Sequence, residues 1–137
     1  MYDPNLVQPM REELTRLGVR EMRTPDEVDQ VLKESDEPIL VIVNSVCGCA
    51  AGAARPAVAL ALQHGKTPPR LATVFAGQDR EATERARSYF AEFPPSSPSM
   101  ALLKAGHVVH MVQRSDIEGH SAQEIAQNLC AAFDQHC

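Results

Sequence analysis

Two cysteines separated by one glycine, Cys47-Gly48-Cys49, are the residues of this sequence best suited to covalent chemistry. They follow an unbroken apolar run, Ile39 to Val43, and precede an alanine-rich segment. Free backbone N–H groups and the helix dipole favour negative charge at the start of a helix, and a thiolate carries such a charge. The motif therefore predicts thiol–disulfide exchange, with Cys47 as the attacking thiolate.

The spacing of the two cysteines favours a short-lived bond between them. Gly48 supplies the backbone freedom that lets the two thiols approach each other. A disulfide between residues i and i+2 closes a very small ring, departs from relaxed geometry and is readily reduced. We therefore predict a cycle in which Cys47 takes a small-thiol adduct from a mixed disulfide, and Cys49 or another thiol resolves that adduct.

Three other interpretations of the motif stay open at this point. The two motif cysteines could be small hydrophobic residues of a buried core. They could also be half of a metal or iron–sulfur site, completed by His136 and Cys137 or by His120, since zinc sites normally add a second close pair of ligands. Third, the chain could be a non-catalytic interaction domain. Under the redox interpretation we expect no bound metal.

Pro98 is the second feature with a possible role at the site. It stands just before a predicted strand, in a segment able to approach the cysteine motif. A proline in cis could present the backbone of Ser97 and Ser99 to an extended substrate, whereas an ordinary turn proline is the alternative. We therefore include Ser97 and Pro98, together with Gly48, as candidate substrate-binding residues.

The remaining cysteines differ in their surroundings. Cys130 falls on the last predicted helix beside Leu129 and Phe133, which predicts a place in the core. Cys137 follows the end of that helix and is expected to be exposed. It is either a resolving thiol or an inert terminus.

The apolar pattern predicts alternating helices and strands that place the motif at a sheet edge. The predicted elements are helix 4–17, strand 19–22, helix 24–37, strand 39–43, helix 49–63, strand 71–76, helix 79–92, strands 100–104 and 107–112, and helix 121–135. The unbroken strand 39–43 is typical of one covered on both faces. We predict a three-layer α/β sandwich around a mixed sheet of about five strands, with the motif at its carboxyl edge, where ligands bind.

Composition limits the classes of function. With 137 residues, of which 44% are hydrophobic and 23% charged, the chain has the size and composition of a single folded domain over residues 1–137. A net charge of −5 with scattered arginines argues against nucleic-acid binding. No apolar run approaches the roughly 20 residues that cross a bilayer, and no secretory signal opens the sequence. We therefore expect a cytoplasmic protein with reduced thiols.

Five blocks of this sequence occur together in one known family. They are Val43 to Gly52 with Ala54-Arg55-Pro56, Val74 to Asp79, Pro95 to Lys104, Ile117 to His120, and Ala132 to Cys137. In this combination the sequence resembles the bacilliredoxin family over nearly its whole length. The motif loop matches the family pattern without departure.

The resemblance implies a thioredoxin-like fold, in which Cys47 and Cys49 replace the usual CxxC pair and Pro98 occupies the cis-proline position. It implies an enzyme, a thiol–disulfide oxidoreductase, that removes bacillithiol from S-bacillithiolated client proteins after oxidative stress. Cys47 would attack and become bacillithiolated, with bacillithiol as a thiol co-substrate and no bound cofactor. Weak disulfide isomerase or reductase activity would also fit.

Overall fold

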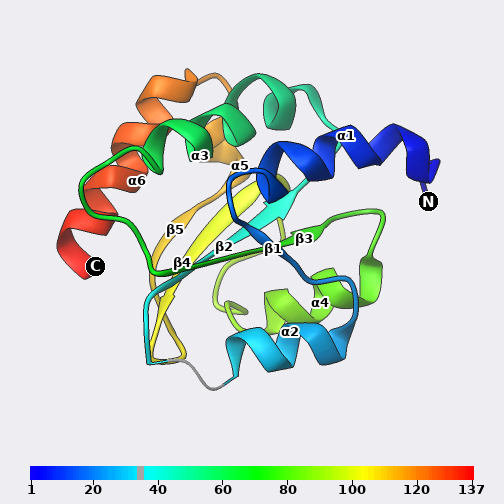
Figure 1. The fold of residues 1–137 in the computed structure, drawn as a ribbon, viewed down its shortest axis with the longest axis horizontal. Coiled ribbons are helices and arrows are strands. Elements are labelled where there is room, and N and C mark those ends of the chain that lie inside the picture. Colours follow the sequence, from blue (N-terminus) through cyan, green and yellow to red (C-terminus); the bar gives the residue numbers. More distant parts are fainter. Residues whose placement is uncertain (34–35) are drawn as a thin grey trace.

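A computed structural model of the chain describes residues 1–33 and 36–137, and it has three layers (Figure 1). A five-stranded mixed sheet, in the order β1-β3-β2-β4-β5, forms the middle layer. The strands are β1 (Arg20–Glu21), β2 (Ile39–Asn44), β3 (Arg70–Phe75), β4 (Ser99–Lys104) and β5 (His107–Val112). The helices are α1 (Pro4–Thr15), α2 (Pro25–Leu32), α3 (Arg55–Ala61), α4 (Arg80–Ser88), α5 (Arg114–Ile117) and α6 (Ala122–His136), with a π-helical turn, η1, at Ala50–Ala54.

The central strand β2 is covered on both faces. Leu40 and Ile42 pack into a core cluster with α1, α3 and α6, whereas Ile39, Val41 and Val43 pack into a second cluster with α2 and α4. Successive side chains of a strand point to opposite faces, so an unbroken apolar strand feeds both cores. Figure 1 shows the two groups of helices on opposite sides of the sheet. The predicted α/β sandwich and its doubly covered strand are confirmed.

Strand register brings three chain segments to one edge of the sheet. β3 runs parallel to β2, β4 runs antiparallel to β2, and β5 runs antiparallel to β4. Val43 lies opposite Ser99, and Met100 lies opposite Val112. The end of β2, the start of β4 and the end of β5 therefore meet at the same edge, which we call the carboxyl edge.

Local signals in the sequence correctly predict the hairpin and the last helix. Ala105 and Gly106 join β4 to β5 with φ angles of 52° and 79°, as a two-residue turn with positive φ at both positions requires. Helix α6 begins with a capping box, in which the Glu124 N–H donates to Ser121 Oγ at 3.1 Å and the Ser121 N–H donates to Glu124 Oε1 at 3.0 Å.

The structure departs from the prediction in the helix that follows the motif. In place of one helix over 49–63 it has η1 followed by α3. The Arg55 N–H donates to the Ala50 carbonyl five residues earlier, which is the π-helical pattern. Pro56, placed at the start of α3, has no N–H to donate, and a π-turn just before it interrupts the helix predicted over 49–63.

Three other elements are shorter than predicted, and the structure contains one helix that was not predicted. β1 keeps two residues, α4 ends at Ser88, and α2 ends at Leu32. The predicted continuation of α2 toward Pro38 includes residues 34–35, which lie outside the described residues. Helix α5 was not predicted, because four residues are too few to show a helical period. No helix among the described residues is long and apolar enough to cross a membrane.

Candidate active site

The thiol loop, Val46 to Cys49, connects β2 to η1 at the carboxyl edge. Cys47 and Cys49 are half-buried free thiols, and Gly48 between them is exposed. The N–H groups of Ala50 and Ala51 donate to the Cys47 carbonyl at 3.1 and 3.3 Å, which closes the loop into the first helical turn. Cys47 therefore stands at the start of the helix within reach of solvent, and the interpretation as a fully buried core pair is wrong.

The two sulfur atoms form a hydrogen-bonded pair at 2.7 Å. Burial raises the pKa of the Cys47 thiol, but hydrogen bonds from Cys49, the Ala50 backbone, Ser45 and the Cys49 backbone together lower it below its ordinary value. Burial raises the pKa of Cys49, and the hydrogen bond and the negative charge of Cys47 raise it further. Cys47 is therefore the thiol of this pair that ionises first, and the Cys49 thiol then donates the hydrogen bond to it.

Ser45 and Asn44 hold the thiol loop in place from the strand side. The Cys47 N–H donates to Ser45 Oγ at 3.2 Å, and the Ser45 N–H donates to Asn44 Oδ1 at 2.8 Å. Asn44 in turn donates from Nδ2 to the Met10 carbonyl on α1 at 3.2 Å. Since Asn44 and Ser45 are both buried, these bonds replace water contacts and give the loop one arrangement.

Arg55 completes this arrangement from the helix side. Its side chain is 3% exposed, and Nη1 donates to Asn44 Oδ1 at 2.9 Å and to the Ser45 carbonyl at 2.8 Å. Nε lies 3.0 Å from Glu13 Oε2, so the buried charge has an acidic partner on α1. We did not assign Arg55 a role from the sequence. The available signal was a single charge in an alanine-rich segment just after the motif.

The segment before β4 reaches the same edge, as predicted. The Ser97–Pro98 peptide bond is cis, Pro98 is buried and Ser97 is half-buried. Because Val43 pairs with Ser99, the residues just before Ser99 lie next to those just after β2. The structure thus brings Gly48, Ser97 and Pro98 to the edge that holds the two thiols. Their contact with a substrate stays a prediction.

Arg114, the first residue of α5, links the Ser97 segment to the thiol pair. Nη1 donates to the Ser97 carbonyl at 3.1 Å, and the backbone N–H donates to Ser96 Oγ at 3.3 Å. Its positive charge lowers the pKa of Cys49 and so offsets part of the increase that burial causes. Sequence analysis missed this residue. Its signal was its position just after β5, which ends at the same edge as β2.

Comparison with known proteins identifies the family. A family profile described as "Disulphide isomerase" matches residues 2–137. A bacilliredoxin of Geobacillus kaustophilus is 57% identical over 99% of this chain and 94% of its own length. A bacilliredoxin of Koribacter versatilis is 54% identical over 100% of this chain and 94% of its own length. The chain belongs to the bacilliredoxin family. The predicted resemblance is confirmed.

Solved structures show that this bacilliredoxin-family chain has the thioredoxin fold. The thioredoxin of Fasciola hepatica superposes with a TM-score of 0.60 at 21% identity, over 87% of this chain and 100% of that one. The thioredoxin of Malassezia sympodialis gives 0.57 at 18% identity, over 86% and 90% of the two chains. Family and fold together make the protein a thiol–disulfide oxidoreductase, as predicted.

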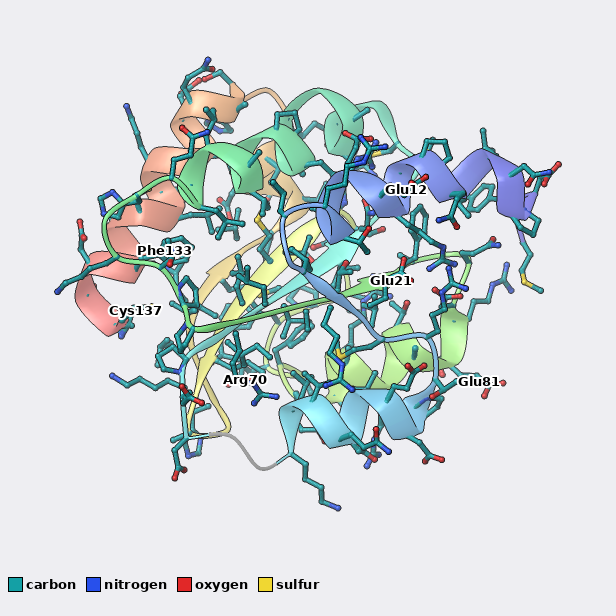
Figure 2. All side chains as sticks on the ribbon, viewed as in Figure 1. Glu12, Glu21, Arg70, Glu81, Phe133 and Cys137 are labelled. Carbon is teal, nitrogen blue, oxygen red and sulfur yellow. The ribbon has the colours of Figure 1, made fainter. Side chains whose placement is uncertain are left out.

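The C-terminal residues of this family member lie away from its thiol loop. Cys137 is exposed at the end of α6 (Figure 2). Burial raises the pKa of its thiol, and the charges of Lys104 and Lys66 lower it in part. Lys104 is the last residue of β4, whereas Ser99, near the thiol loop, is the first. The ligand set proposed for a metal site, the motif cysteines with His136 and Cys137, is therefore not assembled. Over residues 1–33 and 36–137 no three His, Cys, Asp or Glu side chains gather to hold a metal ion.

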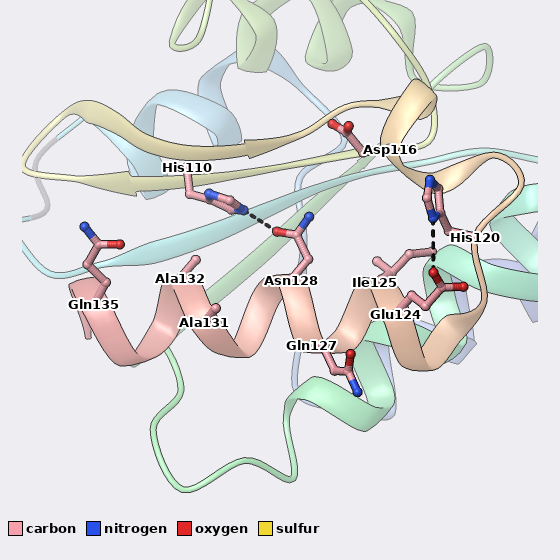
Figure 3. Close-up of a pocket in the computed structure, with 10 residues that line it drawn as sticks. All are labelled: His110, Asp116, His120, Glu124, Ile125, Gln127, Asn128, Ala131, Ala132 and Gln135. Atoms are coloured by element: carbon pink, nitrogen blue, oxygen red, sulfur yellow. Dashed lines mark hydrogen bonds and ion pairs between the residues drawn. The ribbon is translucent and has the colours of Figure 1, made fainter.

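His120, the other ligand considered for a metal site, belongs to a groove of about 620 Å³ between β5 and α6 (Figure 3). It faces Glu124 Oε2 at 3.5 Å, while His110 faces Asn128 Oδ1 at 2.6 Å. Each imidazole thus has its own partner on α6. The groove contains no cysteine, so it is separate from the redox chemistry of the bacilliredoxin motif.

Cys130 is half-buried on α6 and packs against the core cluster that contains Leu129 and Phe133. Burial raises the pKa of its thiol, and the charge of Asp134 raises it further. Its surroundings therefore oppose the thiolate, in contrast to those of Cys47.

Proposed function

We propose that this protein removes bacillithiol from S-bacillithiolated client proteins in the cytoplasm, with Cys47 as the attacking thiolate. The observation that carries the proposal is the half-exposed Cys47, whose sulfur lies 2.7 Å from the Cys49 sulfur, close enough for the Cys49 thiol to donate to a Cys47 thiolate. This donor favours the anion that attacks disulfides. A reducing compartment suits the proposal, because the attacking residue must start each cycle as a free thiol.

The first step transfers the small thiol to the enzyme. An electron pair of the Cys47 thiolate forms a bond to the bacillithiol sulfur, and the disulfide bond to the client breaks. The client sulfur leaves with the bonding electrons and takes up a proton, which restores its cysteine. The number of disulfides is unchanged, because the mixed disulfide has moved from the client to Cys47.

The second step releases the small thiol. Cys49 loses its proton and attacks Cys47 Sγ, and bacillithiol leaves as a thiolate that is then protonated. Cys47 and Cys49 are thereby oxidised to a disulfide, and the two electrons they lose have reduced the original mixed disulfide to two thiols. Either this disulfide is then reduced by external thiols, or an external thiol attacks the adduct on Cys47 directly.

The proton on Cys49 gives this order of events a physical basis. The hydrogen bond to Cys47 and the charge of Cys47 both raise the pKa of Cys49. These two effects disappear when Cys47 is capped by an uncharged disulfide bond, whereas the favourable charge of Arg114 stays. Capping Cys47 therefore lowers the pKa of Cys49 and activates the resolving thiol only after the adduct has formed.

A weaker disulfide isomerase or reductase activity belongs to the same proposal. The matching family profile carries the description "Disulphide isomerase", and attack on a client's own disulfide uses the same Cys47 thiolate. Release of the client by Cys49 would make this a reduction, whereas attack by another client thiol would make it an isomerisation.

The experiment is intact-mass analysis after mixing the protein with a bacillithiolated client. We expect a bacillithiol adduct on Cys47, and we expect Cys49→Ser to accumulate that adduct because it has no resolving thiol. Cys47→Ser should leave the client modified. Cys130→Ser is the matched control, since this half-buried thiol lies on α6, and it should act as wild type. Clearance of the client by Cys47→Ser at the wild-type rate would refute the proposal.

A further inference from the structure

Arg114 stands at the carboxyl edge in line with the thiol loop. Ile42, Met100 and Val112 occupy one row across β2, β4 and β5. Just beyond this row, Cys47 follows the end of β2 and Arg114 follows the end of β5. The Arg114 side chain is 43% exposed, so a molecule attached to the Cys47 sulfur can reach it.

Two of the three guanidinium nitrogens of Arg114 donate hydrogen bonds within the protein, and these bonds orient the group. Nη1 donates to the Ser97 carbonyl at 3.1 Å, and Nε pairs with Glu118 Oε2 at 3.3 Å. Within residues 1–33 and 36–137, no side chain or carbonyl accepts a hydrogen bond from Nη2. A guanidinium held in this way still offers donors and a full positive charge to a carboxylate.

The charge of Arg114 is felt at both sulfur atoms. The Glu118 hydrogen bond raises the pKa of Arg114, and Cys49 and Cys47, each when ionised, raise it further. Charges in a solvated site interact appreciably only over about a Debye length, roughly 8 Å in physiological salt. A small thiol bonded to Cys47 therefore lies within the field of this cation. The chain as a whole has a net charge of −5, which would otherwise repel an anionic ligand.

We infer that Arg114 binds a carboxylate of the low-molecular-weight thiol that is transferred to Cys47, and so gives the enzyme a preference for acidic thiols. The inference rests on the proposed function, since both concern the same transfer. Arg114 contacts the substrate away from the reacting sulfur, so it determines specificity and does not take part in the bond exchange. Glu118 competes for the same guanidinium and weakens the preference.

The test uses two adducts of one cysteine peptide, formed with 3-mercaptopropionate or with 3-mercaptopropanamide, which differ in charge and are similar in shape. We measure kcat/KM for removal of each adduct and take the ratio, acid over amide. Arg114→Gln should lower this ratio about five- to tenfold, mainly through KM. Removal of the amide adduct should also slow, because Arg114 lowers the pKa of Cys49 and holds the Ser97 carbonyl, so the ratio of the two rates and not either rate alone is the readout. Arg20→Gln is the matched control, because Arg20 is exposed on β1, the strand at the other side of the sheet from β5.

A second variant keeps the inference testable if Arg114→Gln does not fold. Glu118→Gln leaves Arg114 in place and removes its competitor, so the ratio should rise. An unchanged ratio in both variants, or an equal loss for both adducts in Arg114→Gln, overturns the inference. Failure of the proposed function looks different: wild-type protein would then leave a bacillithiolated client unchanged, whatever its ratio for the two model adducts.

Discussion

The side chains of Asn44 and Arg55 meet inside the protein, where Arg55 Nη1 donates to Asn44 Oδ1 at 2.9 Å. Asn44 ends the central strand, and Arg55 begins the helix beyond the thiol loop. The same Nη1 also donates to the carbonyl of Ser45, at 2.8 Å. The contact therefore fixes both ends of the segment that carries the two thiols, so the geometry of the sulfur pair depends on a residue that takes no part in the reaction.

Replacing Arg55 should weaken both the fold and this geometry. Arg55→Met removes a buried cation and its hydrogen bonds to Asn44 and Ser45, and we expect a loss of about 3 kcal/mol in the free energy of unfolding. Urea unfolding measures this loss. Arg20→Met, at an exposed position, is the control and should cost less than about 0.5 kcal/mol. Equal effects from the two substitutions would contradict the structural role of Arg55.

The donor at Cys49 should control the acidity of Cys47. Cys49→Ala removes the hydrogen bond over 2.7 Å that helps to lower the Cys47 pKa, so this pKa should rise. Because the thiolate is the reactive form, the rate of alkylation increases as pH rises through the pKa. The midpoint of alkylation against pH should therefore move to higher pH in Cys49→Ala. Cys130→Ala should leave it unchanged, and a fall in the Cys49→Ala midpoint would reject the assignment of donor and acceptor.

A second buried cation holds α1 on the sheet. Arg11 donates to Asp79 over 2.7 and 3.2 Å, and its guanidinium carbon lies 5.3 Å from the centre of the Phe75 ring. Arg11→Met leaves Asp79, whose side chain is 15% exposed, without this partner, and should cost about 3 kcal/mol in thermal or urea unfolding. The control on the same helix is Arg16→Met, which removes a 73% exposed arginine from an ion pair at 3.8 Å and should cost under about 1 kcal/mol.

Tyr89 should ionise only at unusually high pH. Burial raises its pKa to about 12, and the hydrogen bond that its hydroxyl donates to Asp29 over 2.6 Å contributes to the shift. Because this folded-state pKa is above the ordinary value of 10.0, the associated stability is present below pH 10.0 and is lost as pH rises toward about 12. Tyrosinate absorbance against pH measures the transition. Asp29→Asn should move it to lower pH, while Asp26→Asn, which removes an exposed carboxylate from the same helix, should not.

The sequence predicted those parts of the molecule that depend on neighbouring residues. An unbroken β-branched run specifies a strand covered on both faces, and Ala105-Gly106 specifies a tight hairpin. The capping box at Ser121 and Glu124 specifies the start of α6. Each of these signals acts over a few residues, because side-chain direction and turn geometry are local properties of the backbone. For the same reason, the pair of thiols at the start of a helix could be found without coordinates.

Contacts between distant segments could not be predicted in this way. Arg55 reads in the sequence as an ordinary helix arginine, and only the docking of α3 shows that its charge is buried against Asn44. Arg114 reads as a surface residue, and only strand register places it beside Ser97 and the thiols. From the sequence, Cys137 could be a resolving thiol or a metal ligand for the motif, but the position of α6 places it at the other end of the sheet.

The sequence by itself thus determined which residues can carry out thiol exchange and which elements surround them. The tertiary structure decided which of the two thiols has the lower pKa, because the pKa values of Cys47 and Cys49 depend on a sulfur–sulfur distance of 2.7 Å and on the burial of both groups. Hydrogen bonds and charge effects fall off within a few ångströms, so they act only after folding has brought their partners together.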